Sequence, residues 1–213
     1  MGHRFLELAT SPAARDAQAA HGSRAAYARM ESGGPNHDRL GPKEEAFIAA
    51  RDSFYLASVT HDGWPYVQHR GGPPGFLKVL RERQLGFADL AGNKQYLTLG
   101  NIQTEDRVAL FLMDYANRRR LKLLGRMRVP DPAEEPDLVA ALIDGDHPPR
   151  VERCFVIDVE AFDWNCPQHI TPRFTEAELT EALAPVRARI DQLTNDNAAL
   201  RARVALYEQE NRS

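Results

Sequence analysis

The 213-residue sequence has few cysteines, no excess of positive charge and no long apolar run. Its two cysteines, Cys154 and Cys166, do not make a disulfide framework, so we expect a reducing, cytoplasmic location. A formal net charge of −3 argues against a nucleic-acid groove, which needs a basic surface. No stretch approaches the roughly 18 apolar residues that span a membrane, and the N-terminus lacks the apolar core of a signal peptide.

Two signatures of particular chemistries are also missing. No GxGxxG motif follows a predicted strand, so we expect no separate dinucleotide-binding unit. Cys166 and His169 lie close together, but two potential ligands without a second pair are weak evidence for zinc, and we expect no metal site. The same pair lacks the third, orienting group that a Cys–His nucleophile requires.

Short β-rich runs separated by turn signals occupy the middle of the chain. Asp62-Gly63 is a strong hairpin signal between the first two runs. The predicted strands are Ser53–Thr60, Pro65–Arg70, Phe76–Leu80, Gln84–Asp89, Arg107–Asp114, Leu121–Val129 and Arg153–Phe162. Predicted helices cover residues 11–30, 42–51, 92–102 and 131–144. Many short strands with few helices indicate a mainly β fold with helices (α+β), built as a barrel or sandwich.

The C-terminal segment Glu176–Ser213 reads as helix, with Thr175 and Glu178 as a capping box. Pro185 is expected to break this helix or to begin a new one. Beyond it, apolar residues alternate spacings of four and three. The a positions are Ile190, Asn197 and Val204, and the d positions are Val186, Leu193, Leu200 and Tyr207. β-branched residues at a, Leu at d and one Asn at a favour a parallel two-stranded coiled coil.

The tail has two other interpretations. The run is only about three heptads, the lower limit for a coiled coil, so a single amphipathic helix packed on its own barrel is the alternative. A DNA-binding zipper is disfavoured because the preceding segment, TEAELTEALA, is acidic rather than basic.

The stretch between Gly63 and Asn101 is the densest candidate site. Its glycines allow a ligand to approach the backbone, and Arg70, Lys78 and Lys94 supply cations. Gly92-Asn93-Lys94 falls at a predicted helix start, where backbone N–H groups favour a phosphate. The alternative is a plain turn with a solvated lysine.

The middle of the chain, roughly residues 52–173, resembles the pyridoxamine 5′-phosphate oxidase-like family of FMN-binding split β-barrels. The resemblance is carried by DSFYLASVTHDGWPYVQHRGG, GFLKVL, FADLAGNKQY, TLGNI, DRVALFLMDY and RLKLLGRMRV. The motifs QHRGGPPGFL and NCPQHI, the latter within FDWNCPQHITPRF, resemble a bacterial subgroup of that family. With the predicted helices on either side of the barrel, we expect three parts: a helical extension (1–51), the split barrel (52–173) and a C-terminal helix or coiled coil (174–213).

In this family two subunits pair and share FMN sites at their interface, so the resemblance implies a homodimer with FMN as cofactor. The implied cofactor-binding residues are His69, Arg70, Lys78, Phe87, Ala88, Asp89, Asn93, Lys94, Gln95, Arg119, Arg120, Trp164, Asn165, Gln168 and His169. Lys94 keeps a family phosphate cation, whereas Asn93 stands where the family has arginine, and Arg70 is expected to compensate. Arg119 and Arg120 would reach across from the partner subunit. His69 and His169 are the candidate proton donors.

The expected function is flavin-mediated oxidation or reduction of a small molecule with NAD(P)H or oxygen. Pyridoxamine 5′-phosphate oxidase itself is not expected, because its C-terminal arginine and tryptophan segment is replaced here by a coiled coil. A non-catalytic flavin- or haem-binding module and a deazaflavin-dependent reductase are the alternatives, since one fold hosts all three. No nucleic-acid or membrane partner is expected.

Overall fold

The computed structural model describes residues 3–33, 36–143, 150–164 and 167–211. Contacts divide the chain into two compact units, Met1–Ile170 and Thr171–Ser213. The helices of the first unit are α1 (Arg4–Ala9), α2 (Pro12–Ala20), α3 (Arg24–Ser32), α4 (Pro42–Ala49), α5 (Leu97–Thr104) and α6 (Pro136–Leu142). Its strands are β1 (Ser53–Val59), β2 (Pro65–Gly71), β3 (Lys78–Arg81), β4 (Gln84–Leu90), β5 (Arg107–Asp114), β6 (Arg119–Arg128) and β7 (Val151–Trp164). The second unit contains α7 (Glu176–Glu210).

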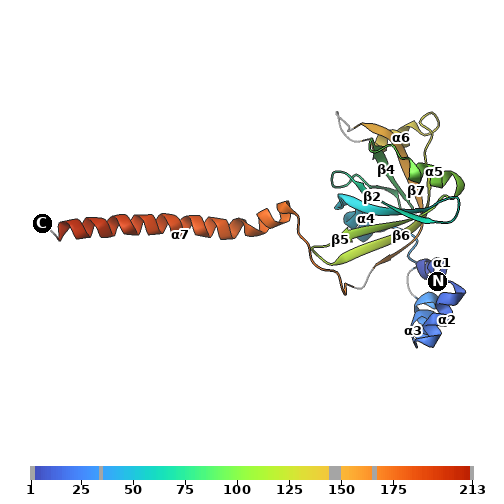
Figure 1. The fold of residues 1–213 in the computed structure, drawn as a ribbon, viewed down its shortest axis with the longest axis horizontal. Helices are drawn as coiled ribbons and strands as arrows, with labels where there is room; N and C mark the ends of the chain where they lie inside the picture. Colours follow the sequence, from blue (N-terminus) through green and yellow to red (C-terminus); the bar gives the residue numbers. More distant parts are fainter. Residues whose placement is uncertain (1–2, 34–35, 144–149, 165–166, 212–213) are drawn as a thin grey trace. The chain divides into compact units, whose positions relative to one another are not determined.

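The seven strands form one antiparallel sheet in the order β2-β1-β5-β6-β7-β4-β3. Figure 1 shows this sheet, with β2, β4, β5, β6 and β7 labelled. Arg70 on β2 nevertheless forms an ion pair with Asp89 on β4, five places away in that order. A flat sheet cannot bring these strands together, because neighbouring strands are about 4.8 Å apart. The sheet is therefore rolled, and the mainly β class with helices that the sequence predicts is confirmed.

Alternating apolar residues line the inside of the rolled sheet. Along β5, Val108, Leu110 and Leu112 are buried, and their neighbours are less so, as expected for side chains that alternate between two faces. Phe54 of β1 packs edge-on against Phe87 of β4, with ring centroids 5.3 Å apart. Polar residues at the ends of β2, β4 and β7 lie outside this core and line the pocket described below.

The N-terminal region is more divided than the sequence predicts. The predicted helix 11–30 is in fact two helices, α2 and α3, because the chain turns at Gly22 with a φ of +75°. The cap at Ser11 is confirmed, since its Oγ accepts a hydrogen bond from the Ala14 N–H at 3.1 Å. Helix α1 was not predicted; together with α2 and α3 it lies beside the N-terminus in Figure 1.

Helix α7 is continuous over 35 residues and contains Pro185 within it. The prediction that Pro185 breaks or begins a helix is therefore wrong. The capping box is confirmed, because the Glu178 N–H donates to Thr175 Oγ1 at 3.2 Å and the Thr175 N–H donates to Glu178 Oε2 at 2.7 Å. Among the described residues, no helix is long and apolar enough to cross a membrane.

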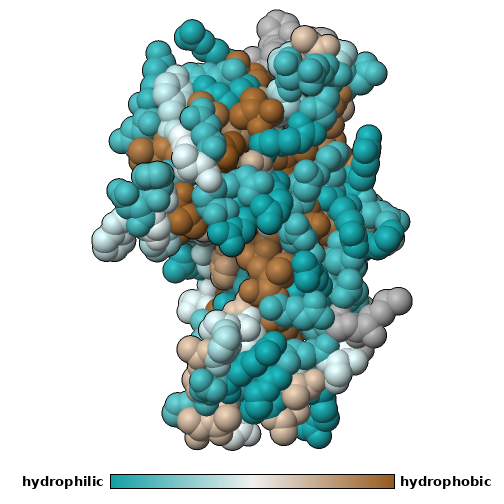
Figure 2. All heavy atoms as spheres, turned by 90° about the vertical axis from the view of Figure 1, so that its right-hand side faces the viewer, coloured by the Kyte–Doolittle hydropathy of each residue, from teal (hydrophilic) through white to brown (hydrophobic). Residues whose placement is uncertain are grey.

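The face in Figure 2 is mostly hydrophilic, with hydrophobic residues showing as separate smaller areas. One apolar area of the first unit can be traced through the strand register. Tyr55 of β1 lies beside His69 of β2 and Phe111 of β5, and all three point outward. Val67, next to Ala57, continues the area and is 60% exposed. We call the surface formed by Tyr55, Ala57, Val67, Ala109 and Phe111 the outer apolar face.

Candidate functional site

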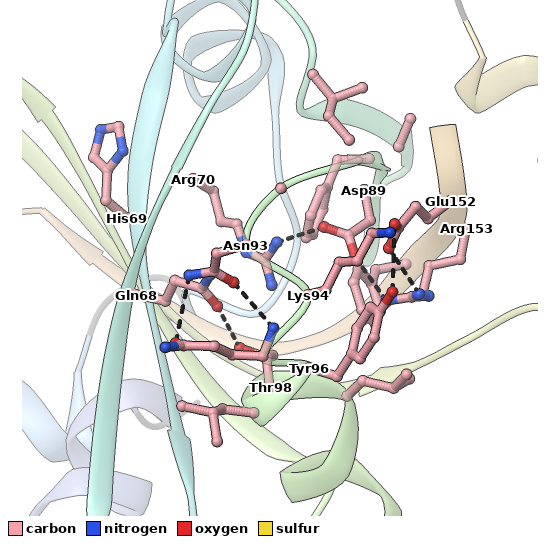
Figure 3. Close-up of a pocket in the computed structure, with 18 of the residues that line it drawn as sticks. Gln68, His69, Arg70, Asp89, Asn93, Lys94, Tyr96, Thr98, Glu152 and Arg153 are labelled. Carbon is pink, nitrogen blue, oxygen red and sulfur yellow. Dashed lines mark hydrogen bonds and ion pairs between the residues drawn. The ribbon is translucent and has the colours of Figure 1, made fainter. Parts of the chain in front are cut away.

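A pocket of about 300 Å³ lies where the ends of β2, β4 and β7 meet the segment before α5 (Figure 3). Its size is at the lower end of the range for small-molecule sites. Its wall combines the aromatic side chains of Phe76, Phe87 and Phe155 with a set of charged groups. The pocket thus has an apolar base and a polar mouth.

The register of β4 and β7 places the key side chains. Phe87 pairs with Phe155, and Asp89, two residues after Phe87, pairs with Arg153, two residues before Phe155, because the strands are antiparallel. Because side chains alternate faces with a period of two, all four point to the same side of the sheet. The aromatic pair joins the core, and the charged pair stands above it at the pocket.

Asp89 joins two arginines from different strands. One of its oxygens accepts a hydrogen bond from Arg70 Nη1, and the other accepts from Arg153 Nη1 at 3.0 Å. The side chains of Arg70, Asp89 and Arg153 are 15%, 8% and 18% exposed, so the network is largely desolvated. Arg70 Nε is buried without a hydrogen-bond partner among the described residues. Because buried N–H groups are normally hydrogen-bonded, this N–H favours the binding of a ligand that carries a hydrogen-bond acceptor.

The pocket carries more positive than negative charge. Its cations are Arg70, Lys94 and Arg153, and its carboxylates are Asp89 and Glu152. Both carboxylates are already engaged by Arg153, since Arg153 Nη2 donates to Glu152 Oε2 at 3.1 Å. An anionic group therefore suits this pocket better than a cationic one.

The segment Gly92–Tyr96 differs from the prediction. Helix α5 begins at Leu97 rather than at Gly92, so Gly92-Asn93-Lys94 is not a helix N-terminus. Lys94 and Tyr96 instead adopt left-handed φ values of 58° and 52°. The side chain of Asn93 organises the turn, because its Oδ1 accepts from the Gln95 N–H at 3.1 Å. Any phosphate cradle here would come from this turn and not from a helix dipole.

Several pocket residues escaped the sequence analysis. Glu152 and Arg153 stand at the start of β7, far along the chain from the predicted site, and only the pairing with β4 brings them in. Tyr96 lies between them: its hydroxyl donates to Glu152 Oε1 at 3.4 Å, and the Arg153 guanidinium lies 4.8 Å from its ring centroid. Gln68 and Thr98 tie β2 to α5 by a 2.8 Å hydrogen bond. The alternation of β2 is a signal that would have found Gln68, since it shares a face with Arg70.

The predicted site residues fall into two groups. Those that line the pocket are His69, Arg70, Phe87, Ala88, Asp89, Asn93, Lys94 and Gln95. Those placed elsewhere in the described part of this chain are Lys78, Arg119, Arg120, Trp164, Gln168 and His169. Asn165 lies outside the described residues. His69 belongs to the pocket rim, but its imidazole points away from the charged cluster in Figure 3 and packs edge-on to Tyr55 on the outer apolar face.

The residues placed elsewhere have other contacts within this chain. Lys78 Nζ donates to the Ala141 carbonyl at 2.6 Å, on the α6 side of the sheet. Trp164 Nε1 donates to Glu44 Oε1 of α4 at 2.7 Å, and the Arg119 guanidinium lies 5.0 Å from the Trp164 ring. Trp164 is thus anchored to α4 and not to the pocket of its own chain.

The comparison with protein families decides the affiliation. A sequence model described as pyridoxamine 5′-phosphate oxidase matches residues 40–162, more than half of the chain. The chain belongs to the pyridoxamine 5′-phosphate oxidase family. The match spans the sheet from α4 to β7, so the split-barrel fold expected from the resemblance is confirmed. No match was found among the curated proteins.

Solved structures resemble the barrel part of the chain at low sequence identity. A suspected pyridoxamine 5′-phosphate oxidase from Lactobacillus delbrueckii is 21% identical, covering 60% of this chain and 96% of its own, with a TM-score of 0.46. HupZ from Group A Streptococcus is 12% identical, covering 63% and 100%, with a TM-score of 0.44. An FMN-binding protein from Syntrophomonas wolfei is 11% identical, covering 57% and 83%, with a TM-score of 0.42.

Proposed function

We propose that this chain is an FMN-binding oxidoreductase that acts on a small molecule. The observation that carries the proposal is the desolvated pair Arg70 and Arg153 beside Lys94, in a pocket with an aromatic base. FMN has a phosphate at one end and a planar apolar ring at the other, and this pocket offers a partner for each.

The phosphate would bind at the charged mouth of the pocket. Arg70 brings a buried Nε that has no hydrogen-bond partner among the described residues, and Lys94 brings an exposed ammonium group. Arg153 supports Arg70, because both guanidinium groups share Asp89. Guanidinium groups suit phosphate because their donors form a planar fork. Asn93 and Gln95 hold the turn that carries Lys94. Asp89 would keep both arginines ordered before the ligand arrives.

The flavin ring would lie towards the apolar side, over the residues around Phe87 and Ala88. Bound FMN would supply the transfer of electrons or a hydride to and from the substrate. The role of the protein residues is to orient the ring, exclude water and place a proton donor. His69 packs against Tyr55 of the outer apolar face, so it would act at a site shared with a partner subunit. Outside the pocket of their own chain lie Arg119, Arg120, Trp164, Gln168 and His169, which would also contribute to a site shared with the partner subunit.

The partner subunit would bind to the outer apolar face. Cross-strand pairing lines up Val67, Ala57 and Ala109 in one row and His69, Tyr55 and Phe111 in the next. Exposed apolar areas of this kind mark protein interfaces in soluble proteins. A second barrel seated there would cover Tyr55 and Val67 and bring a second set of polar groups towards the pocket. We also propose a cytoplasmic location, where the Cys154 thiol stays reduced and buried.

Absorbance of the purified protein tests the cofactor. We expect flavin absorbance bands at about 370 and 450 nm, and bleaching of the second band by NADH or NADPH in the absence of oxygen. A colourless protein that takes up no added FMN would contradict the proposal. A flavin that neither nucleotide bleaches would support a non-catalytic binding module, a Soret band would indicate haem, and selective uptake of a deazaflavin would indicate the related reductase class.

A pair of lysine variants tests the phosphate end. Lys94→Ala should weaken FMN retention about tenfold or more, because a charge-assisted hydrogen bond contributes about 1.5–3 kcal/mol. Lys78→Ala is the matched control, since Lys78 donates to Ala141 outside the pocket. Dissociation constants from flavin fluorescence quenching measure both. Equal weakening by the two variants would contradict the assignment of Lys94 to the phosphate.

A further inference from the structure

Helix α7 extends the heptad pattern beyond Pro185. Because the helix is continuous from Glu176 to Glu210, Leu183 and Leu179 fall at the a and d positions of the same register. The seam then runs from Leu179 to Tyr207, about 43 Å at 1.5 Å per residue, or about four heptads. Pro185 is at a c position, on the outer side of the helix, so its ring does not enter the seam.

The seam is apolar and uncovered. Eight of its nine members are large apolar side chains, and each of them is 44–58% exposed: Leu179, Leu183, Val186, Ile190, Leu193, Leu200, Val204 and Tyr207. The ninth is Asn197. The f positions on the opposite side are alanine or polar, for example Ala188, Asn195 and Ala202. A narrow stripe at a and d with a polar back is the pattern of a two-stranded coiled coil rather than of a helix buried in a core.

Asn197 selects the orientation. In a parallel pair, a positions face a positions, so Asn197 meets Asn197 of the second helix and the two amides hydrogen-bond to each other. In an antiparallel pair, a positions face d positions, and all d residues here are apolar. The amide would then be buried without a partner, which costs free energy. The single Asn also penalises any shift of register.

The flanking charges agree with the same arrangement. In a parallel pair, a g residue lies next to the e residue five positions further along the second helix. This rule matches Asp196 with Arg201 and Arg203 with Glu208, both of opposite sign. The remaining pairs, Ala182 with Arg187 and Arg189 with Thr194, contain no like charges.

We propose that α7 is a self-association helix whose partner is α7 of a second copy of this chain, in a parallel and in-register coiled coil from Leu179 to Tyr207. The Asn197 pair sets the register, and the ion pairs Asp196–Arg201 and Arg203–Glu208 support it. None of these residues lines the pocket, so the proposal does not depend on flavin binding.

Engineered cysteines in the full-length chain test the proposal directly. In a Cys166→Ser background, Leu200→Cys introduces a thiol at a d position and Ala202→Cys introduces one at an f position. The native Cys154 is buried and stays out of the reaction. Under mild oxidation at micromolar protein, the Leu200→Cys chain should form covalent dimers about 100-fold faster than the Ala202→Cys chain. The reason is that thiols facing each other across the seam reach millimolar effective concentrations. Non-reducing gels measure the rate.

The orientation is tested by mixing two chains of different size. Chains with Leu179→Cys and longer, tagged chains with Tyr207→Cys should give only their own homodimers, because a parallel coil keeps the two ends apart. A Leu179→Cys to Tyr207→Cys heterodimer would overturn the parallel arrangement. Equal rates for Leu200→Cys and Ala202→Cys, or no dimer from either Leu200→Cys or Leu193→Cys, would overturn the coiled coil.

Charge reversal provides a second, independent readout. Arg203→Glu places two acidic residues side by side and should slow cross-linking of Leu200→Cys several-fold at low salt. Adding Glu208→Arg should restore the rate, since the pair is again of opposite sign. Circular dichroism checks that the variants keep their helix. Absence of both slowing and rescue would contradict the in-register pairing, while flavin absorbance, read on the same samples, reports on the barrel separately.

Discussion

Asp89 on β4 and Arg153 on β7 stand directly opposite each other in the sheet, and Arg153 Nη1 donates to Asp89 Oδ2 at 3.0 Å. The other carboxylate oxygen accepts from Arg70, which reaches it from β2 across the rolled sheet. One buried carboxylate therefore holds together strands that are distant in the sheet order. Removing its charge should affect the whole barrel.

We expect Asp89→Asn to lower the free energy of unfolding by about 3–5 kcal/mol, because two largely buried guanidinium groups lose their counter-charge. Urea denaturation measures the change. Glu82→Gln is the control: its pair with Arg39 is 64–66% exposed, and such surface pairs are worth about 0–1 kcal/mol. Similar losses for the two variants would show that Asp89 does not hold the strands.

Gly125 lies at the irregularity in the pairing of β6 and β7. A Cβ there would come within 2.6 Å of the Asp158 carbonyl oxygen and 2.8 Å of Ile157 Cγ2. Gly125→Ala should therefore cost about 1–3 kcal/mol of stability. Gly100→Ala on α5, where a Cβ meets nothing within 4 Å, should instead stabilise by about 0.5–1 kcal/mol. Thermal unfolding compares them, and a neutral Gly125→Ala would contradict the close packing.

His37 stacks on His3 at a centroid distance of 4.3 Å. Burial, followed by the nearby His3, holds the pKa of His37 below its ordinary 6.5, while Asp163 and Glu44 oppose the shift. On acidification through about pH 6.5 the unfolded state gains this proton and the folded state does not, so stability should fall as the pH falls. The stability that comes from keeping His37 neutral should therefore be complete above about pH 6.5 and decrease below it.

The His37→Asn variant checks this, because Asn tolerates the left-handed φ of 54° at this position. The decrease in melting temperature between about pH 7.5 and about pH 5.5 should be smaller in His37→Asn than in the wild type. His61→Asn, in the exposed turn after β1, should keep the full decrease. An unchanged decrease in His37→Asn would remove His37 as the cause.

Pro185 lies inside α7 and not at its start. Its ring cannot donate a hydrogen bond and crowds the carbonyl of Glu181, so Pro185→Ala should stabilise the helix by up to about 3 kcal/mol. The thermal transition of α7, followed by circular dichroism, should move to higher temperature. If a new helix began at Pro185, proline would be favourable there, and the substitution would leave the transition unchanged or lower it.

Local patterns in the sequence were enough for much of the fold. The strand Arg107–Asp114, the Asp62-Gly63 turn and the Thr175–Glu178 box each depend on neighbours in the chain, and each is found as predicted. The errors at Pro185 and Gly22 arise where a local preference competes with its surroundings. Pro185 carries a strong local signal, yet the surrounding helix-forming residues continue through it.

By itself, the sequence determined the family, the mainly β class, the strands and the cationic stretch that contains Arg70 and Lys94. Only the tertiary structure decided which charges meet. Asp89 is 64 residues from Arg153 and 19 from Arg70, and no local pattern encodes that three strands roll together at one carboxylate. The tertiary structure also decided that Lys78 bonds to the Ala141 carbonyl and Trp164 to Glu44, and not to the pocket. The two-residue alternation along a strand determines which face of the sheet a side chain is on, whereas closure of the sheet determines which side chains it contacts.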